Sequence, residues 1–376
     1  MGEGVAVSNN SSKVIRQWVS MPGGSCDLRV GDGAIGTLGT VLKGSTGKPH
    51  TCALVTDGDV SDELAERVRR LLTDAGYLVR LVRLAGEACA CTLPAVEGLA
   101  TKLAELHVTA DDVVCAVGGV DVLSLSSFVC ASWCTGTPLA HIPTDLYAAI
   151  TASTTPRGIG VAGVPDMLSA RAGAKYQLCD LGIMETDPSS AAFLNARATM
   201  VASALCDSEQ AVSRLWDRAE LRVGGDLETL KDQLADTAKS RGHIVASTSI
   251  ATRQTIDYGR TFMRALSRLT GGTIPEGLLL AEAIRFQSRI AAAMEILSVD
   301  DVLTMDELLD LLGLEPVTCD VDPDELVAAL REERFLRSSR FIICLPRGIG
   351  RVRPASVDED LLAEHAGAWC ATRASA

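Results

Sequence analysis

Between residues 51 and 142, short apolar runs alternate with longer segments of helical period, and this alternation constrains the fold more than any other feature of the chain. The apolar runs are CALVT, LVRLV, VVCAV and PLAHI, with segments of helical period at residues 61–75 and 93–106 between the first three. A strand, a covering helix and a further strand repeat in this way in α/β proteins. The sequence therefore predicts a parallel sheet built from βαβ units.

The helix expected over residues 61–75 carries its own start and stop signals. Ser61 can cap its N-terminus and Gly76 can end it. The acidic Asp62 and Glu63 suit the positive end of the helix dipole. The apolar stripe consists of Leu64, Val68, Leu71 and Leu72. A stripe of this kind indicates that one face of the helix is buried against the sheet.

Beyond Pro188 the pattern changes to long Ala- and Leu-rich helical periods with few strand signals. The periods cover residues 189–205, 227–240, 255–269 and 277–297. A late apolar run at 340–345 can add a strand, and residues 358–376 suit a terminal helix or tail. A chain of 376 residues is long enough for two cores of ordinary size. We expect a Rossmann-like α/β domain over residues 1–187 and a mostly α-helical domain over residues 188–376.

Composition excludes several classes of function. The formal net charge of −13 argues against a nucleic-acid binder, so any affinity for anions must be local. The twelve cysteines include no C-x-x-C pair and fit small apolar residues in a reducing compartment. The N-terminus has no apolar signal region, and no apolar stretch reaches the length of a membrane span. We therefore expect a soluble cytoplasmic protein that binds neither nucleic acid nor membrane.

Two local patterns leave their function open. The expected strand at 113–117 runs into Gly118 and Gly119, which would let a nucleotide phosphate approach the backbone but also suit an ordinary tight turn. No two of the five histidines have the i, i+4 spacing of a helical metal site, and His141 fits a core or strand-end position.

Basic residues punctuate the second half of the chain at Lys239, Arg253, Arg260 and Arg264. The last two are four residues apart, so they share one helix face. Like charges there repel each other unless an anion lies between them. The pattern fits either a solvated surface or a site for a phosphate or carboxylate.

The stretch GGVDVLSLSSFVCASWCTGTPLAHIPTDLYAAITAS resembles the core of 3-dehydroquinate synthase, of the sugar phosphate cyclase superfamily. The likeness extends from about Leu28 to Leu345. It implies a Rossmann-like NAD domain, a helical metal domain, an active site in the cleft between them, and a homodimer. By this resemblance, Gly118 and Gly119 fall on glycines that contact NAD, and Thr144 falls in the I-P-T segment of the same site.

The departures from the family pattern concern first the zinc ligands. The motif G-H-T-F-G-H-A stands here as GRTFMRA, so Arg260 replaces a metal-binding histidine and Arg264 a catalytic one. The H-G-E motif stands as Glu276-Gly277-Leu278, and the glutamate of A-E-V-I-K aligns with Ala198. A guanidinium cannot ligate a cation, so we expect no metal.

Cofactor and substrate positions are changed as well. Family residues that contact NAD are replaced by Val120, Ser124 and Thr151, so we expect weak or no NAD binding. Anion-binding positions persist, because Lys239 and Arg253 fall on residues that hold the substrate's phosphate or carboxylate. Arg157 replaces a lysine and Asp257 an asparagine. The resemblance thus implies a cleft for a small acidic or polar metabolite.

Three functions remain open. The leading hypothesis is a metal-free, NAD-independent enzyme of specialised metabolism that catalyses an elimination, cyclisation or isomerisation. The second is a catalytically inactive pseudoenzyme that serves as a partner or scaffold protein and fills its cleft with its own salt bridges. The third is a cyclase with an unusual metal site. An open cleft lined by arginines and carboxylates would favour an enzyme.

The expected catalytic residues are Arg260, Arg264, Asp257 and Glu276, with Arg157, Lys239 and Arg253 binding the substrate. Arg260 and Glu276 occupy positions that converge on one ion in the family, so we expect them to form an ion pair. Arg264 would then remain free to bind an anionic group.

Overall fold

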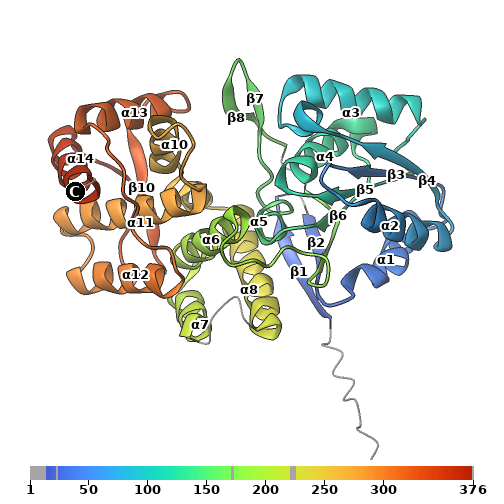
Figure 1. Ribbon diagram of the computed structural model, residues 1–376, viewed down its shortest axis with the longest axis horizontal. Helices are drawn as coiled ribbons and strands as arrows, with labels where there is room; N and C mark the ends of the chain where they lie inside the picture. Colours follow the sequence, from blue (N-terminus) through green and yellow to red (C-terminus); the bar gives the residue numbers. More distant parts are fainter. Residues whose placement is uncertain (1–13, 23, 171–172, 221–225, 375–376) are drawn as a thin grey trace, which may run out of the picture.

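The computed structural model describes residues 14–22, 24–170, 173–220 and 226–374, and a seven-stranded sheet organises its first half (Figure 1). The strand order is β1-β2-β9-β6-β5-β3-β4, and every neighbouring pair except β1–β2 is parallel. The strands are β1 (Ile15–Met21), β2 (Gly24–Gly31), β3 (Thr51–Thr56), β4 (Leu78–Arg83), β5 (Val113–Gly118), β6 (Leu139–Pro143) and β9 (Tyr176–Asp180). The predicted parallel sheet is confirmed.

Helices cover both faces of this sheet. Successive residues of a strand point to opposite faces, and β3 shows the result. Cys52 and Leu54 join a buried cluster with α1 and α2, whereas Ala53 and Val55 join one with α3 and α4. The helices of this half are α1 (Leu38–Thr46), α2 (Asp62–Asp74), α3 (Leu93–Glu105), α4 (Val120–Ser132) and α5 (Leu146–Thr151).

Side-chain hydrogen bonds to the backbone position these elements, and the cap at Ser61 was predicted from the sequence. The Ser61 hydroxyl accepts a hydrogen bond from the Leu64 N–H at 3.2 Å and so caps α2. Asp180 ends β9, and its buried carboxylate accepts the N–H groups of Gly33 at 3.0 Å and Ile35 at 3.2 Å. Asp180 therefore fastens the turn after β2 to the centre of the sheet.

The second half consists mainly of helices, beginning where the Ser190 hydroxyl caps α6. Its elements are α6 (Ala191–Asp207), α7 (Glu209–Glu220), α8 (Leu227–Ala246), α9 (Ile250–Gln254), α10 (Arg260–Leu269), α11 (Glu276–Ala293), α12 (Val299–Leu311), α13 (Pro323–Phe335), β10 (Ile342–Pro346), β11 (Val352–Ser356) and α14 (Glu359–Arg373). Strand β10 confirms the late apolar run, and α14 confirms the terminal helix. No helix among the described residues is long and apolar enough to cross a membrane.

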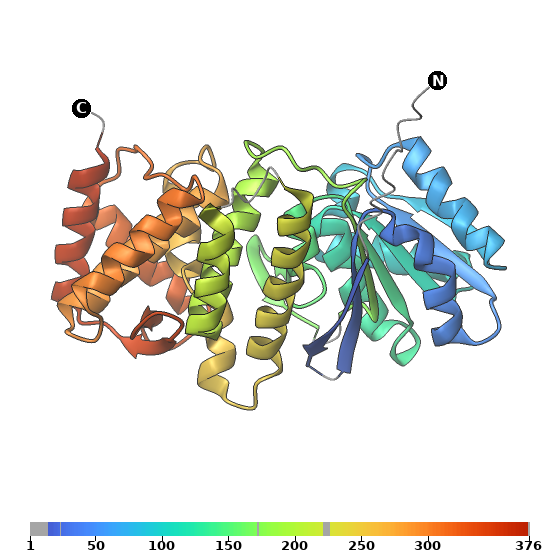
Figure 2. The same cartoon turned by 90° about the horizontal axis from the view of Figure 1, so that it is seen from below.

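The two halves lie side by side and share apolar packing at their junction (Figure 2). Helix α8 packs along β1, and one buried cluster joins Val19 and Leu28 of the sheet to α6, α8 and α11. A separate hairpin of β7 (Ile159–Val161) and β8 (Val164–Leu168) leaves the sheet half and projects between the halves (Figure 1). This arrangement fixes the walls of a cleft.

Candidate functional site

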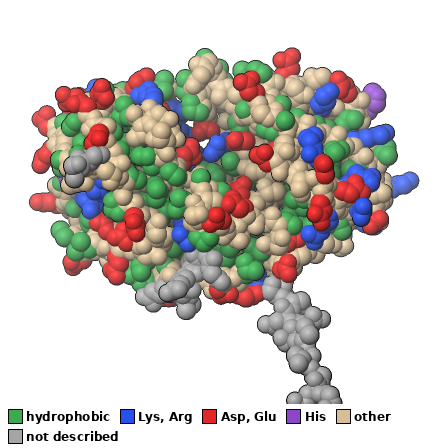
Figure 3. Space-filling model, viewed as in Figure 1, with side chains coloured by type: hydrophobic (Ala, Val, Ile, Leu, Met, Phe, Trp, Pro, Cys, Tyr) green, Lys and Arg blue, Asp and Glu red, His purple; other side chains and the backbone are tan. Residues whose placement is uncertain are grey.

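A cavity of about 750 Å³ lies in this cleft, with a smaller chamber of about 330 Å³ beside it. The space-filling view shows the surface hollowed where the halves meet, with acidic and basic side chains near the hollow (Figure 3). Residues of both halves line the large cavity, and several residues line both chambers. The shared residues are Thr155, Gly158, Asp166, Ile256, Arg260 and Arg264.

The lining of the two chambers is rich in charge. Seven arginines line them, namely Arg157, Arg241, Arg253, Arg260, Arg264, Arg268 and Arg337. Six carboxylates face them, namely Asp121, Asp166, Asp257, Glu276, Glu332 and Glu333. In a chain whose formal net charge is −13, a cleft in which arginines outnumber carboxylates is a local exception. Such a cleft favours an anionic ligand.

Arg241 is a buried cation of the large cavity, and it has no carboxylate partner among the described residues. Its side chain is 3% exposed and donates hydrogen bonds to the hydroxyls of Ser203, at 3.0 Å, and Thr155. Its Nε has no hydrogen-bond partner within the described chain. Burial, reinforced by the charge of Arg260, lowers the pKa of Arg241 to about 10. The guanidinium stays charged at neutral pH and is poorly compensated.

The next residue explains why Arg241 is directed into the cavity. A Cβ on Gly242 would lie 2.8 Å from the Ser20 carbonyl oxygen and 2.7 Å from a Val19 methyl of β1. Only glycine permits so close an approach of α8 to β1. The face of α8 that carries Gly242 is therefore pressed against the sheet, and this contact sets the rotation of the helix about its axis.

Lys239, expected to bind the substrate, is exposed and lies outside the lining of both chambers. Two residues along a helix correspond to a rotation of about 200°, so Lys239 and Arg241 point in nearly opposite directions. The basic residue of α8 that lines the cavity is therefore Arg241 and not Lys239. The sequence alone does not decide between the two residues, because the rotation of α8 about its axis depends on its contact with β1.

The expected ion pair between Arg260 and Glu276 is not formed. Glu276 instead accepts a hydrogen bond from Arg157 Nη2 at 3.4 Å, and Arg157 Nη1 donates to Asp121 at 3.0 Å. The nearest carboxylate partner of Arg260 is Asp257, with 3.8 Å between Nη1 and Oδ1. The reason is that Glu276 begins α11 facing the sheet half, where Arg157 reaches it first.

The backbone of Arg157 is held by Ser124 of α4. The Ser124 hydroxyl on α4 accepts the backbone N–H of Arg157 at 2.9 Å, and the guanidinium lies 5.9 Å from the centre of the Tyr147 ring. Burial alone would lower the pKa of Arg157, but the charge of Asp121 and further partners outweigh it and raise the pKa. Arg157 is thus a fixed cation on the wall of the large cavity.

Arg264 was expected to be free, and this expectation is wrong. Its guanidinium forms ion pairs with Asp166 on the hairpin and with Glu333 on α13, the latter at 3.5 Å. The sequence prediction missed Asp166 because the short hairpin carries almost no periodic signal.

Arg253 lines the smaller chamber, where Nη1 donates to the carbonyl oxygens of Ser247 at 2.7 Å and Thr248 at 3.2 Å.

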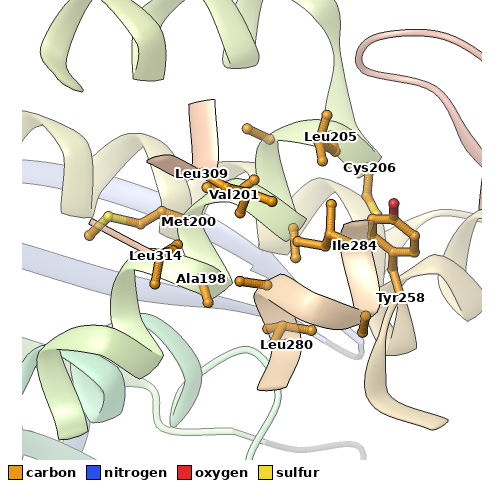
Figure 4. Close-up of a cluster of buried hydrophobic side chains, with 14 of the residues drawn as sticks. Ala198, Met200, Val201, Leu205, Cys206, Tyr258, Leu280, Ile284, Leu309 and Leu314 are labelled. Atoms are coloured by element: carbon orange, nitrogen blue, oxygen red, sulfur yellow. The ribbon is translucent and has the colours of Figure 1, made fainter. Parts of the chain in front are cut away.

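The residues of the cleft do not fit a zinc site with three protein ligands. Among the described residues, no group of three or more His, Cys, Asp or Glu side chains is placed to hold a metal ion. Ala198, aligned with a family ligand, lies in the core, where Figure 4 shows it among apolar side chains with Val201. Thr199, the next residue along α6, lines the cavity instead.

The crevice at the end of β5 does not fit a dinucleotide phosphate either. The Gly119 N–H that opens α4 donates to Asp57 Oδ2 at 2.9 Å, and a Cβ on Gly118 would lie 2.1 Å from that oxygen. The Thr144 N–H donates to the Gly118 carbonyl at 3.1 Å. The chain's own carboxylate therefore lies where a phosphate would bind the helix N-terminus, and Asp121 adds negative charge in the first turn.

Tyr258 is a further cavity residue that the sequence did not reveal. Its ring is buried, its hydroxyl has no hydrogen-bond partner within the described chain, and burial raises its pKa well above the usual value. The prediction that His141 is a core histidine is confirmed. His141 is buried beside the Ser127 hydroxyl, and burial lowers its pKa to about 3.

Comparison with known proteins agrees with this fold. Residues 82–193 match the family model described as 3-dehydroquinate synthase N-terminal. A 3-dehydroquinate synthase from Rhodopirellula baltica is 23% identical over 304 residues, which cover 80% of this chain and 81% of the relative. One from Nocardia farcinica is 26% identical over 330 residues, covering 84% and 85%.

Solved structures extend the likeness over nearly the whole chain. A 2-deoxy-scyllo-inosose synthase superposes with a TM-score of 0.79 at 16% identity, covering 94% of this chain and 99% of the other. The 2-epi-5-epi-valiolone synthase ValA from Streptomyces hygroscopicus subsp. jinggangensis superposes with a TM-score of 0.75 at 19% identity, covering 93% and 97%. The fold is therefore that of the sugar phosphate cyclases. In sequence, the chain is similar to 3-dehydroquinate synthases over most of its length.

Proposed function

We propose that this chain is a metal-free, NAD-independent enzyme of specialised metabolism that binds a small phosphorylated or carboxylated metabolite in the cleft. The reaction classes that fit are elimination, cyclisation and isomerisation. The observation that carries this proposal is the buried guanidinium of Arg241, which faces an open cavity without a carboxylate partner among the described residues.

The argument from Arg241 is energetic. Taking a charge out of water without a counter-ion costs several kcal/mol, so an unpaired buried cation rarely persists for structural reasons alone. The two hydroxyls that hold Arg241 are neutral and offset only part of this cost. An anionic ligand would offset the remainder, which makes an anion the natural occupant of this end of the cavity.

The remaining cavity residues offer acid–base and oxyanion chemistry. Glu276 is a carboxylate fixed by Arg157 on the cavity wall, which suits a general base. Arg260 lines both chambers with only a long contact to Asp257, so it can stabilise negative charge that develops on a substrate or leaving group. Together with Arg241, these groups are what a base-initiated elimination of an anion requires.

Metal- and NAD-independence rest on the residues of the cleft. The zinc-ligand positions provide a single carboxylate, and Asp57 lies at the phosphate position of α4. The 2-deoxy-scyllo-inosose synthase is described as complexed with carbaglucose-6-phosphate, NAD+ and Co2+. We carry over from it the ligand class, a sugar-like phosphate.

We also propose that the protein lies in the cytoplasm and forms a homodimer. Light scattering of the purified protein would test the homodimer.

The second candidate is a pseudoenzyme that acts as a partner or scaffold. Ion pairs that cross the cleft, Arg157–Glu276 and Arg264–Asp166, favour it. They leave a cavity of about 750 Å³, however, which is the size of a small-molecule site. The open cavity favours the enzyme.

Thermal unfolding with ligands tests the proposal. Protein treated with a chelator is heated alone, with D-glucose 6-phosphate, and with unphosphorylated glucose. We expect the phosphate ester to raise the Tm of the wild type and of Lys239→Met, and to leave Arg241→Met unchanged. Lys239→Met is the matched control, because it removes an exposed cation from the same helix. Stabilisation that requires added zinc or NAD, or that persists in Arg241→Met, would overturn the proposal.

A further inference from the structure

The hairpin β7–β8 connects the sheet half to the helical half across the mouth of the cleft. Among the described residues, its hydrogen bonds and ion pairs with the helical half all go to two arginines. Asp166 pairs with Arg264, and the Pro165 carbonyl accepts a hydrogen bond from Arg337 Nη2 at 2.6 Å. Figure 1 shows the hairpin between the sheet half and α10, the helix that carries Arg264, and Arg337 follows α13.

The backbone around Asp166 is built to present this carboxylate. Asp166 has a φ of +55°, a conformation that aspartate tolerates better than most residues but that still requires support. Support comes from the Gly158 N–H, which donates to Asp166 Oδ1 at 2.8 Å. A Cβ on Gly158 would lie 2.8 Å from the Asp166 Cα, so glycine is needed opposite the aspartate.

A second ion pair crosses the cleft with the opposite polarity. The sheet half supplies the cation Arg157 and the helical half the anion Glu276, whereas the reverse holds for Asp166 and Arg264. The Asp166–Arg264 pair also lies at the boundary between the chambers, because both residues line both of them.

We propose that Asp166 is a built-in anion that holds the cleft closed on Arg264 until the anionic group of a ligand replaces it. We call the Asp166–Arg264 pair the latch. This inference rests on the proposed function, since it requires an anionic ligand. In the closed state Arg264 pairs with Asp166, and in the open state it pairs with the anionic group of the ligand.

Two features make release of the latch inexpensive. Arg264 retains Glu333 at 3.5 Å when Asp166 leaves, so its charge is not left unpaired. The two strands of the hairpin lie outside the large sheet. At the base of the hairpin, the Gly160 N–H donates a hydrogen bond to the Cys91 carbonyl at 2.7 Å. The side chains of Met167 and Leu168 are exposed. A hairpin with so little buried surface belongs to the part of a structure that opens locally.

Calorimetric titration of D-glucose 6-phosphate into four proteins tests the latch. The variant is Asp166→Asn, since asparagine accepts the positive φ and can still bond the Gly158 N–H while losing the charge. The matched control is Glu332→Gln, which removes a carboxylate paired with Arg268 at 2.8 Å on the same cavity but outside the latch. Wild type and Arg241→Met complete the set. Hydrogen exchange of residues 159–168 is followed with and without the ligand.

We expect Asp166→Asn to lower the Kd at least fivefold, Glu332→Gln to change it less than twofold, and the ligand to speed exchange in the wild-type hairpin. An unchanged or weaker Kd in Asp166→Asn, with binding still lost in Arg241→Met, would overturn the latch and leave the proposed function standing. If none of the four proteins binds, the proposed function fails and the latch with it.

Discussion

Replacing Arg241 with methionine should stabilise the ligand-free protein while abolishing its affinity for anions. Burial lowers the pKa of Arg241 from its usual value to about 10. A fall of this size means that burial of the charged guanidinium costs roughly 3 kcal/mol, since one pKa unit corresponds to about 1.4 kcal/mol. Because the folded-state pKa is the lower one, the cost is fully present below pH 10, and therefore at neutral pH. Methionine fills similar space without a charge.

The gain is partly offset by two lost hydrogen bonds, each worth about 1 kcal/mol. The Ser203 hydroxyl remains satisfied, because it also donates to the Thr199 carbonyl at 2.6 Å. The net expectation is a gain of about 1 kcal/mol in the free energy of unfolding, measured by urea denaturation at pH 7. Lys239→Met should change it by less than about 0.5 kcal/mol. A loss of more than about 1 kcal/mol in Arg241→Met would refute the reasoning, because it would show that the guanidinium is already compensated.

Four further predictions follow from the same contacts. Elemental analysis should find no stoichiometric zinc after dialysis against a weak chelator, because the cleft offers no set of three ligands; about one zinc per chain would contradict this. Titration with NAD should show no low-micromolar binding, and dehydroquinate synthase activity should be absent, because Asp57 occupies the phosphate position of α4. Glu276→Gln should lower the free energy of unfolding by less than about 1 kcal/mol, since the Glu276 side chain is 43% exposed and solvent screens its pair with Arg157; a loss of 3 kcal/mol would mean that the pair is effectively buried. Burial alone would raise the pKa of Asp112, but hydrogen bonds from His50, Thr109 and Thr51 outweigh burial and lower the pKa. The Tm of wild type should therefore exceed that of Asp112→Asn by less and less as the pH falls below about 4. A Tm difference that stays constant down to pH 2 would contradict this prediction.

The sequence predicts the sheet well because its signals are local and repeated. The alternation of apolar runs and helical periods specifies β3 to β6 and their helices, and Ser61 caps α2 as expected. The elements that it misses have weaker signals. The hairpin β7–β8 is short and half exposed, and β1 and β2 lie before the alternation begins.

The sequence predicts which residues line the candidate site, but it does not predict which carboxylates and arginines form ion pairs. The sequence identifies Arg157, Arg260, Arg264 and Glu276 as cleft residues, and all four line the large cavity. Which carboxylate meets which guanidinium depends on side chains brought in from distant segments. Asp166 reaches Arg264 across 98 positions of sequence, and no local pattern encodes that contact.

The choice of Lys239 over Arg241 shows a different limit. The two residues are close in sequence, but the rotation of α8 about its axis decides which one faces the ligand. The contact of Gly242 with β1 fixes that rotation. A long-range contact therefore determines a local assignment.

A crystal structure grown with phosphate, zinc and NAD all present tests the central claim most directly, because the three ligands compete for the cleft in one experiment. We predict a phosphate ion within hydrogen-bond distance of the Arg241 guanidinium, and neither a metal ion beside Glu276 nor a dinucleotide at the N-terminus of α4. A zinc ion coordinated in the cavity, or NAD bound with Asp57 displaced from Gly119, would contradict the account.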